Sequence, residues 1–328
     1  MKSDFSFERE ADRLTLVVNL ASTAPDEKQR LIEEYEKRSE AAFSPSTLRN
    51  YRQIKSIFVR WCQERGVNHV PPIAPQVIAE YIEDMGGKLK SSTIETRLWA
   101  ISEMHRAAFE PSPCRNRLVE LALKGVKRRY GAFVRQAAPL SKKEVMEVIR
   151  RLGNSRLDLR DKALLWIASD SWCRSSEIVA FKVRDVHRQL DGTSLLHVTR
   201  SKTDPYGEGA FAFLSAAGTR AVLEWVEVAD LKAEDPLLTK SQVNGAKTPL
   251  DTATISRIMR RCTAREDISA HSTRVGGVQD AFRLGCDLSS IMVAGRWSSP
   301  EMPARYGRRI LASQSAAAQV SAAFSEEE

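Results

Sequence analysis

The sequence predicts a mainly α-helical protein of two domains, the first an all-α bundle and the second helical with a small antiparallel β-hairpin. At 328 residues the chain is long for a single hydrophobic core. Apolar residues recur with the helical period of about 3.6 through the first half, where no strand pattern occurs. The pattern becomes that of strands only at Ser194–Thr199 and Gly209–Leu214.

The balance of charge favours a polyanionic partner. Lysine and arginine number 50 against 42 aspartates and glutamates, which gives a net charge of +8 and an isoelectric point near 9.3. Nucleic acid is the first partner such a protein suggests, although charge alone leaves an ordinary basic protein equally open. The chain is 42% hydrophobic and 28% charged, as is usual for globular proteins.

The cysteines indicate a reducing compartment. All five are scattered, without a C-x-x-C pair, which disfavours a disulfide framework and a zinc site. No apolar run reaches the length of a membrane span, and the first residues lack the apolar core of a signal peptide. We therefore expect a cytoplasmic, nucleoid-associated protein without membrane contact.

Start and stop signals divide the first half into helices. Residues 1–24 carry no clear period, and we expect a partly disordered arm there. Prolines at first helical positions, a capping box and glycine stops predict the rest. The expected helices begin near Asp26, at Ser44-Pro45 (ending at Gly66), at Pro75 (ending at Gly86-Gly87), at the capping box Ser92-Thr93-Ile94-Glu95, and at Ser112-Pro113 (ending at Gly125).

A basic connector with Lys127, Arg128 and Arg129 precedes the second domain. Such runs are usually solvated surface, but between two domains a linker that follows a phosphate backbone is about as well supported. A capping box at Ser141 opens the second domain. The expected helices span about 141–152, 157–170, 174–182, 216–230, 251–264, 272–284 and 287–294, with strands at 194–199 and 209–214. An alanine-rich tail follows from Ile310.

One tyrosine near the C-terminus is the first candidate for chemistry. Tyr306 lies on a short predicted helix between arginines. Ser299 can cap this helix, Pro300 suits its first position, and Gly307 is expected to end it. Neighbouring cations favour the phenolate of a group whose ordinary pKa is about 10. A half-buried structural tyrosine is the commoner case, so the rest of the chain must decide.

Three further clusters suit phosphate chemistry. Arg174 and Glu177 are three residues apart at a predicted helix start, where a surface ion pair is the plainer interpretation. His271 and Arg274 repeat this spacing at a helix N-terminus, which favours anions. There an arginine can clamp two phosphate oxygens while the histidine handles a proton. Lys202 lies in the hairpin loop and could donate a proton in a cleft, although most lysines in turns are surface residues.

In this order, with Trp297 and Tyr306, the clusters resemble the motif of the tyrosine site-specific recombinases. That family carries an arginine with a nearby acid, a hairpin lysine, His-x-x-Arg, a histidine or tryptophan, and the tyrosine. The matching residues are Arg174, Glu177, Lys202, His271, Arg274, Trp297 and Tyr306. The five-helix first half and the helical tail also resemble the family's layout. Two local departures are Ala270, where close members carry glycine, and Pro303, close before the tyrosine.

The resemblance implies site-specific DNA recombination without a metal or nucleotide cofactor. Tyr306 would attack the scissile phosphate and leave a 3′-phosphotyrosyl link and a free 5′-hydroxyl, and exchange would pass through a Holliday junction. The implied roles are charge neutralisation by Arg174 and Arg274, hydrogen bonds from His271 and Trp297, proton donation by Lys202, and orientation of the site by Glu177.

The resemblance also implies a C-shaped clamp of both domains on double-stranded DNA with inverted-repeat target sites. Helices near 45–65, 92–108 and 251–263 are candidates for the major groove, against the plainer interpretation of solvated surface. The candidate DNA contacts are Lys90, Ser91, Thr93, Arg97, Lys127, Arg128, Arg129, Arg257 and Arg260.

The expected organisation follows from these assignments. It comprises a flexible arm (1–24), a core-binding helical domain (25–125), a basic linker (126–138), a catalytic domain (139–309) and a helical tail (310–328). The tail would dock on a neighbouring protomer through Leu311, Val320 and Phe324, giving a homotetramer on two DNA sites; docking on its own domain is the alternative. The gene would belong to a bacterium, phage or plasmid.

Two other functions stay open. The chain could be a catalytically inactive DNA-binding or architectural protein, or a type IB topoisomerase-like enzyme.

Overall fold

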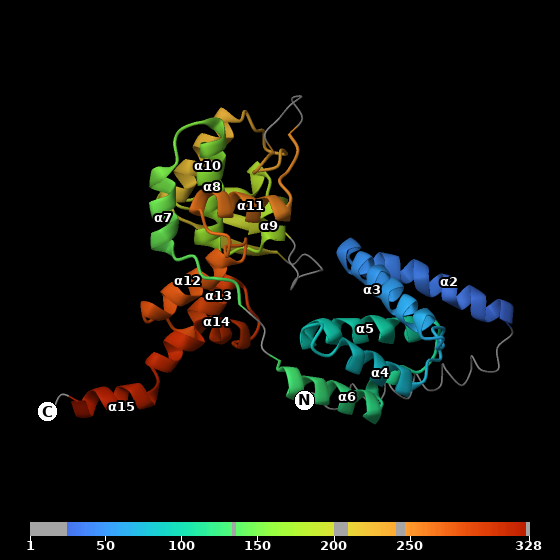
Figure 1. The fold of residues 1–328 in the computed structure, drawn as a ribbon. Helices are drawn as coiled ribbons and strands as arrows, with labels where there is room; N and C mark the ends of the chain where they lie inside the picture. The colour runs from blue at the N-terminus through green and yellow to red at the C-terminus, as the bar shows by residue number, and fades with distance from the viewer. Residues whose placement is uncertain (1–24, 133–135, 200–208, 241–246, 326–328) are drawn as a thin grey trace. The chain divides into compact units, whose positions relative to one another are not determined.

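A computed structural model of the chain describes residues 25–132, 136–199, 209–240 and 247–325. It divides into two compact units, unit 1 up to Arg135 and unit 2 from Gln136 onward (Figure 1). The elements are predominantly helices, with one three-stranded antiparallel sheet in unit 2. This architecture confirms the predicted fold class. The predicted arm and the hairpin loop that contains Lys202 lie outside the described residues.

Unit 1 is a helical bundle. Its elements are α2 (Pro25–Ala42), α3 (Pro45–Glu64), α4 (Pro75–Met85), α5 (Ser91–Ala107), the 3-10 helix η1 (Pro113–Arg115) and α6 (Arg117–Tyr130). Ser44 caps α3 by accepting a hydrogen bond from the Thr47 backbone N–H, as the sequence predicts. In the core, Phe58 and Trp61 each pack edge-on against Tyr81, with 5.0 Å between ring centroids.

Three helix boundaries in unit 1 differ from the prediction. The fifth helix does not begin at Ser112-Pro113, because Pro113–Arg115 form the separate 3-10 helix η1 and α6 begins at Arg117. Helix α5 begins at Ser91, with Lys90 at the N-cap position and no side-chain cap, so the predicted capping box at Ser92 does not form. Helix α6 continues past Gly125 to Tyr130. A glycine weakens a helix without necessarily stopping it, and the lysine and arginines that follow are good helix formers. The first part of the predicted linker is therefore helical.

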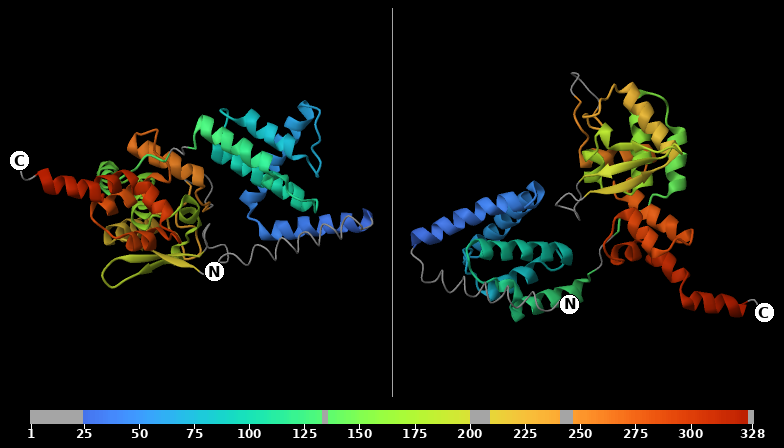
Figure 2. Two further views of the ribbon diagram at one scale, coloured as in Figure 1. Left: turned by 90° about the horizontal axis from the view of Figure 1, so that it is seen from below. Right: turned by 180° about the vertical axis from the view of Figure 1, so that it is seen from behind.

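Unit 2 begins with helices and continues into the sheet. Its first elements are α7 (Lys142–Arg151), α8 (Arg156–Ser171), α9 (Ser175–Ala180), η2 (Val183–Asp185), β1 (Val186–Arg188), β2 (Ser194–Val198), β3 (Ala210–Leu214) and α10 (Ala216–Val228). The predicted capping box between Ser141 and Glu144 forms. The strand order is β1-β2-β3, with Leu195 opposite Phe213. The sheet is the group of yellow-green strands in Figure 2. Strand β1 was not predicted, because three residues are too few to show a period.

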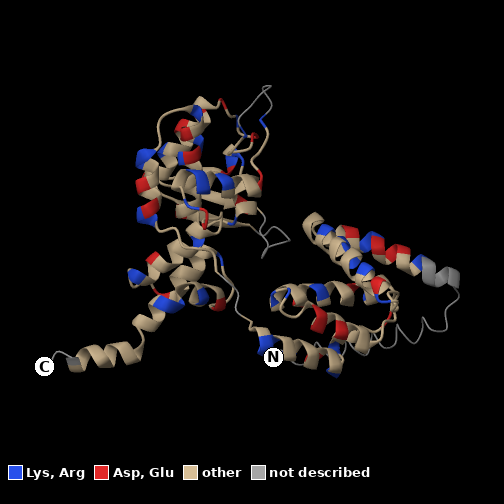
Figure 3. Ribbon diagram, in the orientation of Figure 1, with Lys and Arg blue, Asp and Glu red and all other residues tan. Residues whose placement is uncertain are grey.

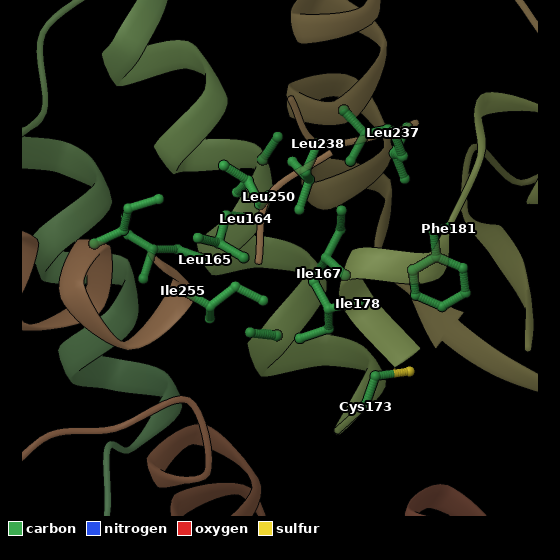
Figure 4. Close-up of a cluster of buried hydrophobic side chains, with 14 of the residues drawn as sticks. Leu164, Leu165, Ile167, Cys173, Ile178, Phe181, Leu237, Leu238, Leu250 and Ile255 are labelled. Atoms are coloured by element: carbon green, nitrogen blue, oxygen red, sulfur yellow. The ribbon is translucent and has the colours of Figure 1, made fainter. Parts of the chain in front are cut away.

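The core of unit 2 surrounds α8. Leu164, Leu165 and Ile167 of this helix are fully buried, and Ile178 of α9 packs in the same cluster (Figure 4). Helix α8 packs against both α10 and β3, so it is covered on most of its circumference. It therefore gives a rigid base for the short segment between Ser171 and α9, which carries Arg174.

The second half of unit 2 is helical. Its elements are α11 (Thr252–Thr263), α12 (Ser272–Arg283), α13 (Leu288–Gly295), α14 (Glu301–Ser313) and α15 (Ala316–Ser325). Helices α12 and α14 pack together at Gly307, where an added Cβ would overlap the ring of Phe282. Gly307 therefore lies within α14 and permits close approach, whereas the sequence predicted the helix end there. The N-cap is Pro300 without a side-chain cap, so the predicted Ser299 cap is also absent.

Helix α15 carries no charged residue (Figure 3). Val320 and Phe324 on this helix are 58% and 69% exposed. Leu311, at the end of α14, instead packs against the cluster formed by α12 and α14.

Among the described segments, none combines the length and the apolarity that a membrane-spanning helix requires.

The glycine at the α12–α14 contact yields the first prediction. Gly307→Ala should destabilise unit 2 by about 1–3 kcal/mol, because overpacking against Phe282 outweighs the gain in helix propensity. The matched control is Gly125→Ala in α6, where an added Cβ meets nothing within 4 Å and should stabilise unit 1 by up to about 1 kcal/mol. Urea denaturation of both variants measures the two effects. Equal stability of Gly307→Ala and the wild type would contradict the packing argument.

Candidate active site

Tyr306 projects from α14 into unit 2. The residue is 8% exposed, and its hydroxyl lies 2.7 Å from Nε2 of His271. The two rings meet edge-on with 5.4 Å between their centroids. Gln279 of α12 donates a hydrogen bond of 3.2 Å to the Tyr306 carbonyl and so ties the two helices together. The helix pair thus holds a phenol and an imidazole in direct contact.

His271 and Arg274 come from the N-terminus of α12. His271 is the N-cap residue, and Arg274 lies in the first turn. Arg274 is 1% exposed, and its guanidinium donates to the carbonyls of Trp172 and Gly295. Its Cζ lies 4.1 Å from the ring centroid of Trp297, a cation–π contact. The cation is therefore fixed in place without any ligand.

Arg174 and Glu177 come from the start of α9. Oε2 of Glu177 accepts a 2.9 Å hydrogen bond from the Arg174 backbone N–H, and Oε1 accepts a 2.8 Å bond from Nη1 of Arg174. The carboxylate side chain is 1% exposed, whereas the arginine side chain is 21% exposed. The pair is therefore no ordinary surface ion pair, because a buried carboxylate anchors a guanidinium that still reaches the surface.

Two tryptophans form the apolar wall of the cluster. The ring of Trp297 lies 6.0 Å from that of Tyr306 and 6.4 Å from that of Trp172. A Cβ on Gly295 would overlap the Trp297 ring, and one on Gly277 would overlap the Trp172 indole. Both rings therefore lie against helix backbone that only glycine leaves open.

Burial and neighbouring cations keep His271 neutral. Burial first, then the charges of Arg274 and Arg174, lower the pKa of His271 from 6.5 to about 4. Burial, followed by the charges of Arg174 and Arg296, lowers the pKa of Arg274 to about 10. At neutral pH the imidazole is therefore uncharged while Arg274 stays charged.

The surroundings of the cluster raise the pKa of Tyr306 and lower the pKa of Glu177. Burial raises the pKa of the Tyr306 phenol, although Arg274 and Arg174 act against it. Tyr306 is therefore protonated at neutral pH, and it would need a proton acceptor to act as a nucleophile. Burial also acts to raise the pKa of Glu177, but the backbone N–H of Arg174 and the charges of Arg296 and Arg174 outweigh it and leave that pKa lowered. Glu177 is therefore an ionised anchor.

The structure gathers most of the predicted catalytic residues into one cluster. They are Tyr306, His271, Arg274, Arg174, Glu177 and Trp297. Lys202 lies outside the described residues. Sequence reasoning missed Arg296, Trp172 and Gln279, which contact this cluster. The available signals were the position of Arg296 directly before Trp297 and the helical spacing of eight residues between His271 and Gln279.

The predicted DNA contacts differ in exposure. The exposed residues are Lys90, Thr93, Arg128, Arg129 and Arg257. The others are partly covered or engaged: Ser91 with the carbonyl of Gly131, Arg97 with the hydroxyl of Tyr81, Lys127 with the carboxylate of Glu95, and Arg260 half-buried in α11. Because Ser91 is buried, its side chain offers little surface to a duplex. As contacts to DNA, all nine stay predictions.

The described residues show no cluster that could hold a metal ion. Within 25–132, 136–199, 209–240 and 247–325, no three His, Cys, Asp or Glu side chains are suitably placed. The cysteines are free thiols, and burial raises the pKa of Cys173, beside the cluster, to about 11. Cys173 is therefore an uncharged neighbour of the arginines.

Comparison with known proteins identifies the chain as an enzyme that cleaves and transfers DNA strands. The chain belongs to the phage integrase family, the tyrosine recombinases, whose family model matches residues 102–310. It is 26% identical to the recombinase Cre of Escherichia phage P1 over 315 residues, which cover 88% of this chain and 91% of Cre. It is 27% identical to an integrase/recombinase XerD homolog of Selenomonas ruminantium over 297 residues, 86% of each chain.

Solved structures share the fold. The Tn1549 transposon integrase in complex with transposon right-end DNA aligns with a TM-score of 0.61 and 13% identity over 84% of this chain and 94% of that one. The XerH site-specific recombinase in a post-cleavage complex with its difH substrate aligns with a TM-score of 0.56 and 18% identity over 75% of this chain and 72% of that one.

The lowered pKa of His271 predicts a pH dependence of stability. Because the folded pKa is about 4 and the ordinary value 6.5, the unfolded chain binds the proton first as the pH falls. The free energy of unfolding should drop as the pH passes below about 6.5, by up to about 3 kcal/mol when it reaches about 4. Urea denaturation of the wild type and of His271→Gln across this range isolates the effect. Parallel pH curves for the two proteins would show that His271 is not responsible.

Proposed function

We propose that this protein is a site-specific DNA recombinase that cuts and rejoins strands through a 3′-phosphotyrosyl intermediate on Tyr306. The observation that carries the proposal is the 2.7 Å contact between the Tyr306 hydroxyl and Nε2 of His271, beside Arg174 and Arg274. The isoelectric point near 9.3 suits a DNA substrate. The likeness to the recombinase Cre, which extends over most of both chains, supports the same reaction.

In the proposed step, the phenolic oxygen of Tyr306 bonds to phosphorus while the bond from phosphorus to the 5′ oxygen breaks. The phenolic proton passes to His271, which is neutral at rest. The leaving 5′ oxygen takes a proton, for which Lys202 is the proposed donor. One phosphate diester replaces another, so rejoining is the reverse of cleavage and needs no nucleotide cofactor.

Positive charge around the phosphate would supply much of the acceleration. Arg174, whose side chain is 21% exposed, would contact the non-bridging oxygens, while buried Arg274 acts as a fixed charge behind them. Loss of one such positioned donor typically costs about 3–4 kcal/mol of transition-state stabilisation. Trp297 would donate its indole N–H to the same phosphate, and Glu177 would orient Arg174.

Recognition of DNA is proposed to use both units. The domains would be the core-binding domain (25–125) and the catalytic domain (139–309), joined by the basic linker into a C-shaped clamp. Exposed cations such as Lys90, Arg128 and Arg257 would contact phosphates or bases of an inverted-repeat site. The protein would act in the cytoplasm of a bacterium, where such DNA is found.

Assembly is proposed to use α15. Its exposed Val320 and Phe324 give an uncharged helix an apolar face suited to another protein surface. A helix passed from each copy to the next closes a ring of four on two DNA sites, as strand exchange through a Holliday junction requires. Docking of α15 on its own unit would leave each protomer without this connection.

Two other functions compete with recombination. A DNA-binding protein without activity would need neither a neutral histidine at the tyrosine hydroxyl nor a buried cation behind it. A type IB topoisomerase-like enzyme would cut and religate without exchanging strands between two sites. The exposed apolar face of α15 favours exchange over relaxation alone.

A nicked DNA substrate, carrying a site selected from random duplexes by the wild-type chain, separates these functions. The wild type should form a covalent adduct that survives denaturation, and Tyr306→Phe should form none while binding with the same Kd. Exchange between two intact sites then separates a recombinase from a topoisomerase. Failure of the wild type to form an adduct on a site that it binds would leave only the architectural role.

Removal of residues 316–328 tests the assembly. The truncated chain keeps Leu311 and the α12–α14 contact, so it should fold, bind one site normally and cleave a nicked substrate. Pairing of two sites should fall at least about tenfold in a gel-shift titration, since burial of one large apolar side chain contributes about 1.5–3 kcal/mol. Unchanged pairing would show that α15 is not the connecting element.

A further inference from the structure

Arg296 occupies a strained position between α13 and α14. Its φ of 54° lies in the left-handed region, at the C-cap of α13, where glycine is usually found. Its side chain nevertheless turns inward and is 10% exposed. Its Nε is one of two buried side-chain nitrogen or oxygen atoms among the described residues that lack a hydrogen-bond partner. A residue kept under strain with an unsatisfied N–H indicates a requirement other than stability.

The guanidinium of Arg296 joins three segments that meet at the cluster. Nη1 donates to the carbonyls of Ser171, at the end of α8, and of Ala294, at 3.1 and 3.3 Å. Nη2 donates to Oε2 of Glu177 at 2.9 Å and lies 3.2 Å from Sγ of Cys173. The next residue in the chain is Trp297, whose ring covers Arg274. Arg296 is therefore attached to both sides of the cluster.

Glu177 is shared between two arginines. Its Oε1 accepts from Nη1 of Arg174 and its Oε2 from Nη2 of Arg296. A guanidinium binds a carboxylate most strongly when both oxygens accept from it, in the bidentate fork. Because Oε2 accepts from Nη2 of Arg296 and from the backbone N–H of Arg174, the Arg174 side chain has a single bond to Glu177, and 21% of it is exposed.

We propose that Arg296 is a positioning residue for strand transfer: it occupies one oxygen of Glu177, leaves Arg174 free to bind the scissile phosphate, and fixes the backbone that carries Trp297. The inference rests on the proposed function of the Tyr306 site. Without Arg296, Arg174 can close a bidentate pair with Glu177 and withdraw from the phosphate. Cleavage then slows while DNA binding, which depends on many other contacts, is preserved.

The test is single-turnover cleavage of the nicked selected site by full-length variants. Arg296→Met removes the charge but keeps an apolar stem, and cleavage should slow about 10- to 100-fold, the usual loss when a partner that orients an active group is removed. The Kd for DNA should change less than about threefold. Arg296→Lys, which keeps a charge near Oε2, should recover part of the rate. Arg296→Gly, which suits the left-handed backbone, provides a well-folded variant without the side chain.

A matched control exists in the same unit. The buried carboxylate of Asp161 is also shared by two arginines, with Arg160 on Oδ1 and Arg261 on Oδ2, but it lies outside the cluster. Arg160→Met should lower stability and leave the cleavage rate of the folded protein within about twofold. A rate loss in Arg296→Met that matches its loss of stability and of DNA binding would reduce Arg296 to a structural role and overturn the proposal.

The coupling to Glu177 gives a second readout. If Arg296 acts by occupying this carboxylate, Arg296→Met should cost far less in a Glu177→Gln background than in the wild type. Multiplicative losses in the double variant would contradict the shared role. An unchanged cleavage rate in all three Arg296 variants, with normal adduct formation by the wild type, overturns the inference alone. Absence of a wild-type adduct instead refutes the proposed function of the site.

Discussion

The close packing of α12 against α14 is the constraint on which the rest of the site depends. Gly307 lets the two helices approach until its backbone meets the ring of Phe282, and this brings Tyr306 of one helix onto His271 of the other. The bond from Gln279 to the tyrosine carbonyl holds the same register. The proposed nucleophile and its proposed proton acceptor are therefore positioned by helix packing, which is stiffer than any loop could be.

Within this frame, charge is arranged around one buried anion. Glu177 pairs with Arg174 and Arg296, while Arg274 donates to carbonyl oxygens and lies on the face of Trp297. The cluster as a whole is therefore positive in a place where water is largely excluded, and this suits a ligand with negative charge. Burial first, and then the same positive charge, keep the histidine neutral at rest, which leaves its Nε2 in contact with the Tyr306 hydroxyl as an uncharged partner.

Local signals predicted the helices well because caps and prolines act over a few residues, as at Ser44 and Ser141. They failed where tertiary packing decided. Gly307 suggests a helix stop, but the ring of Phe282 packs against its backbone within α14. Gly125 failed for a different reason: no packing partner lies beside it, and the helix-forming residues that follow let α6 continue. Most residues of the cluster could be predicted from the sequence because their order and spacing match a known motif. The carbonyl partners of Arg274 and the second partner of Glu177 were not, since those contacts join residues more than 20 positions apart.

The uncharged helix α15 sets a limit on how free copies of this chain behave. Because Val320 and Phe324 are 58% and 69% exposed, covering them on another surface would contribute about 2–4 kcal/mol in total. Bringing two free proteins together loses about 4–15 kcal/mol of translational and rotational freedom, so this helix cannot hold dilute copies together by itself. When two copies are already bound to one duplex, most of this freedom has been lost on binding DNA. Burial of Val320 and Phe324 would then be enough to hold the two copies together. If α15 docks on a neighbouring protomer as proposed, this contact would form only between copies that the same DNA already holds together.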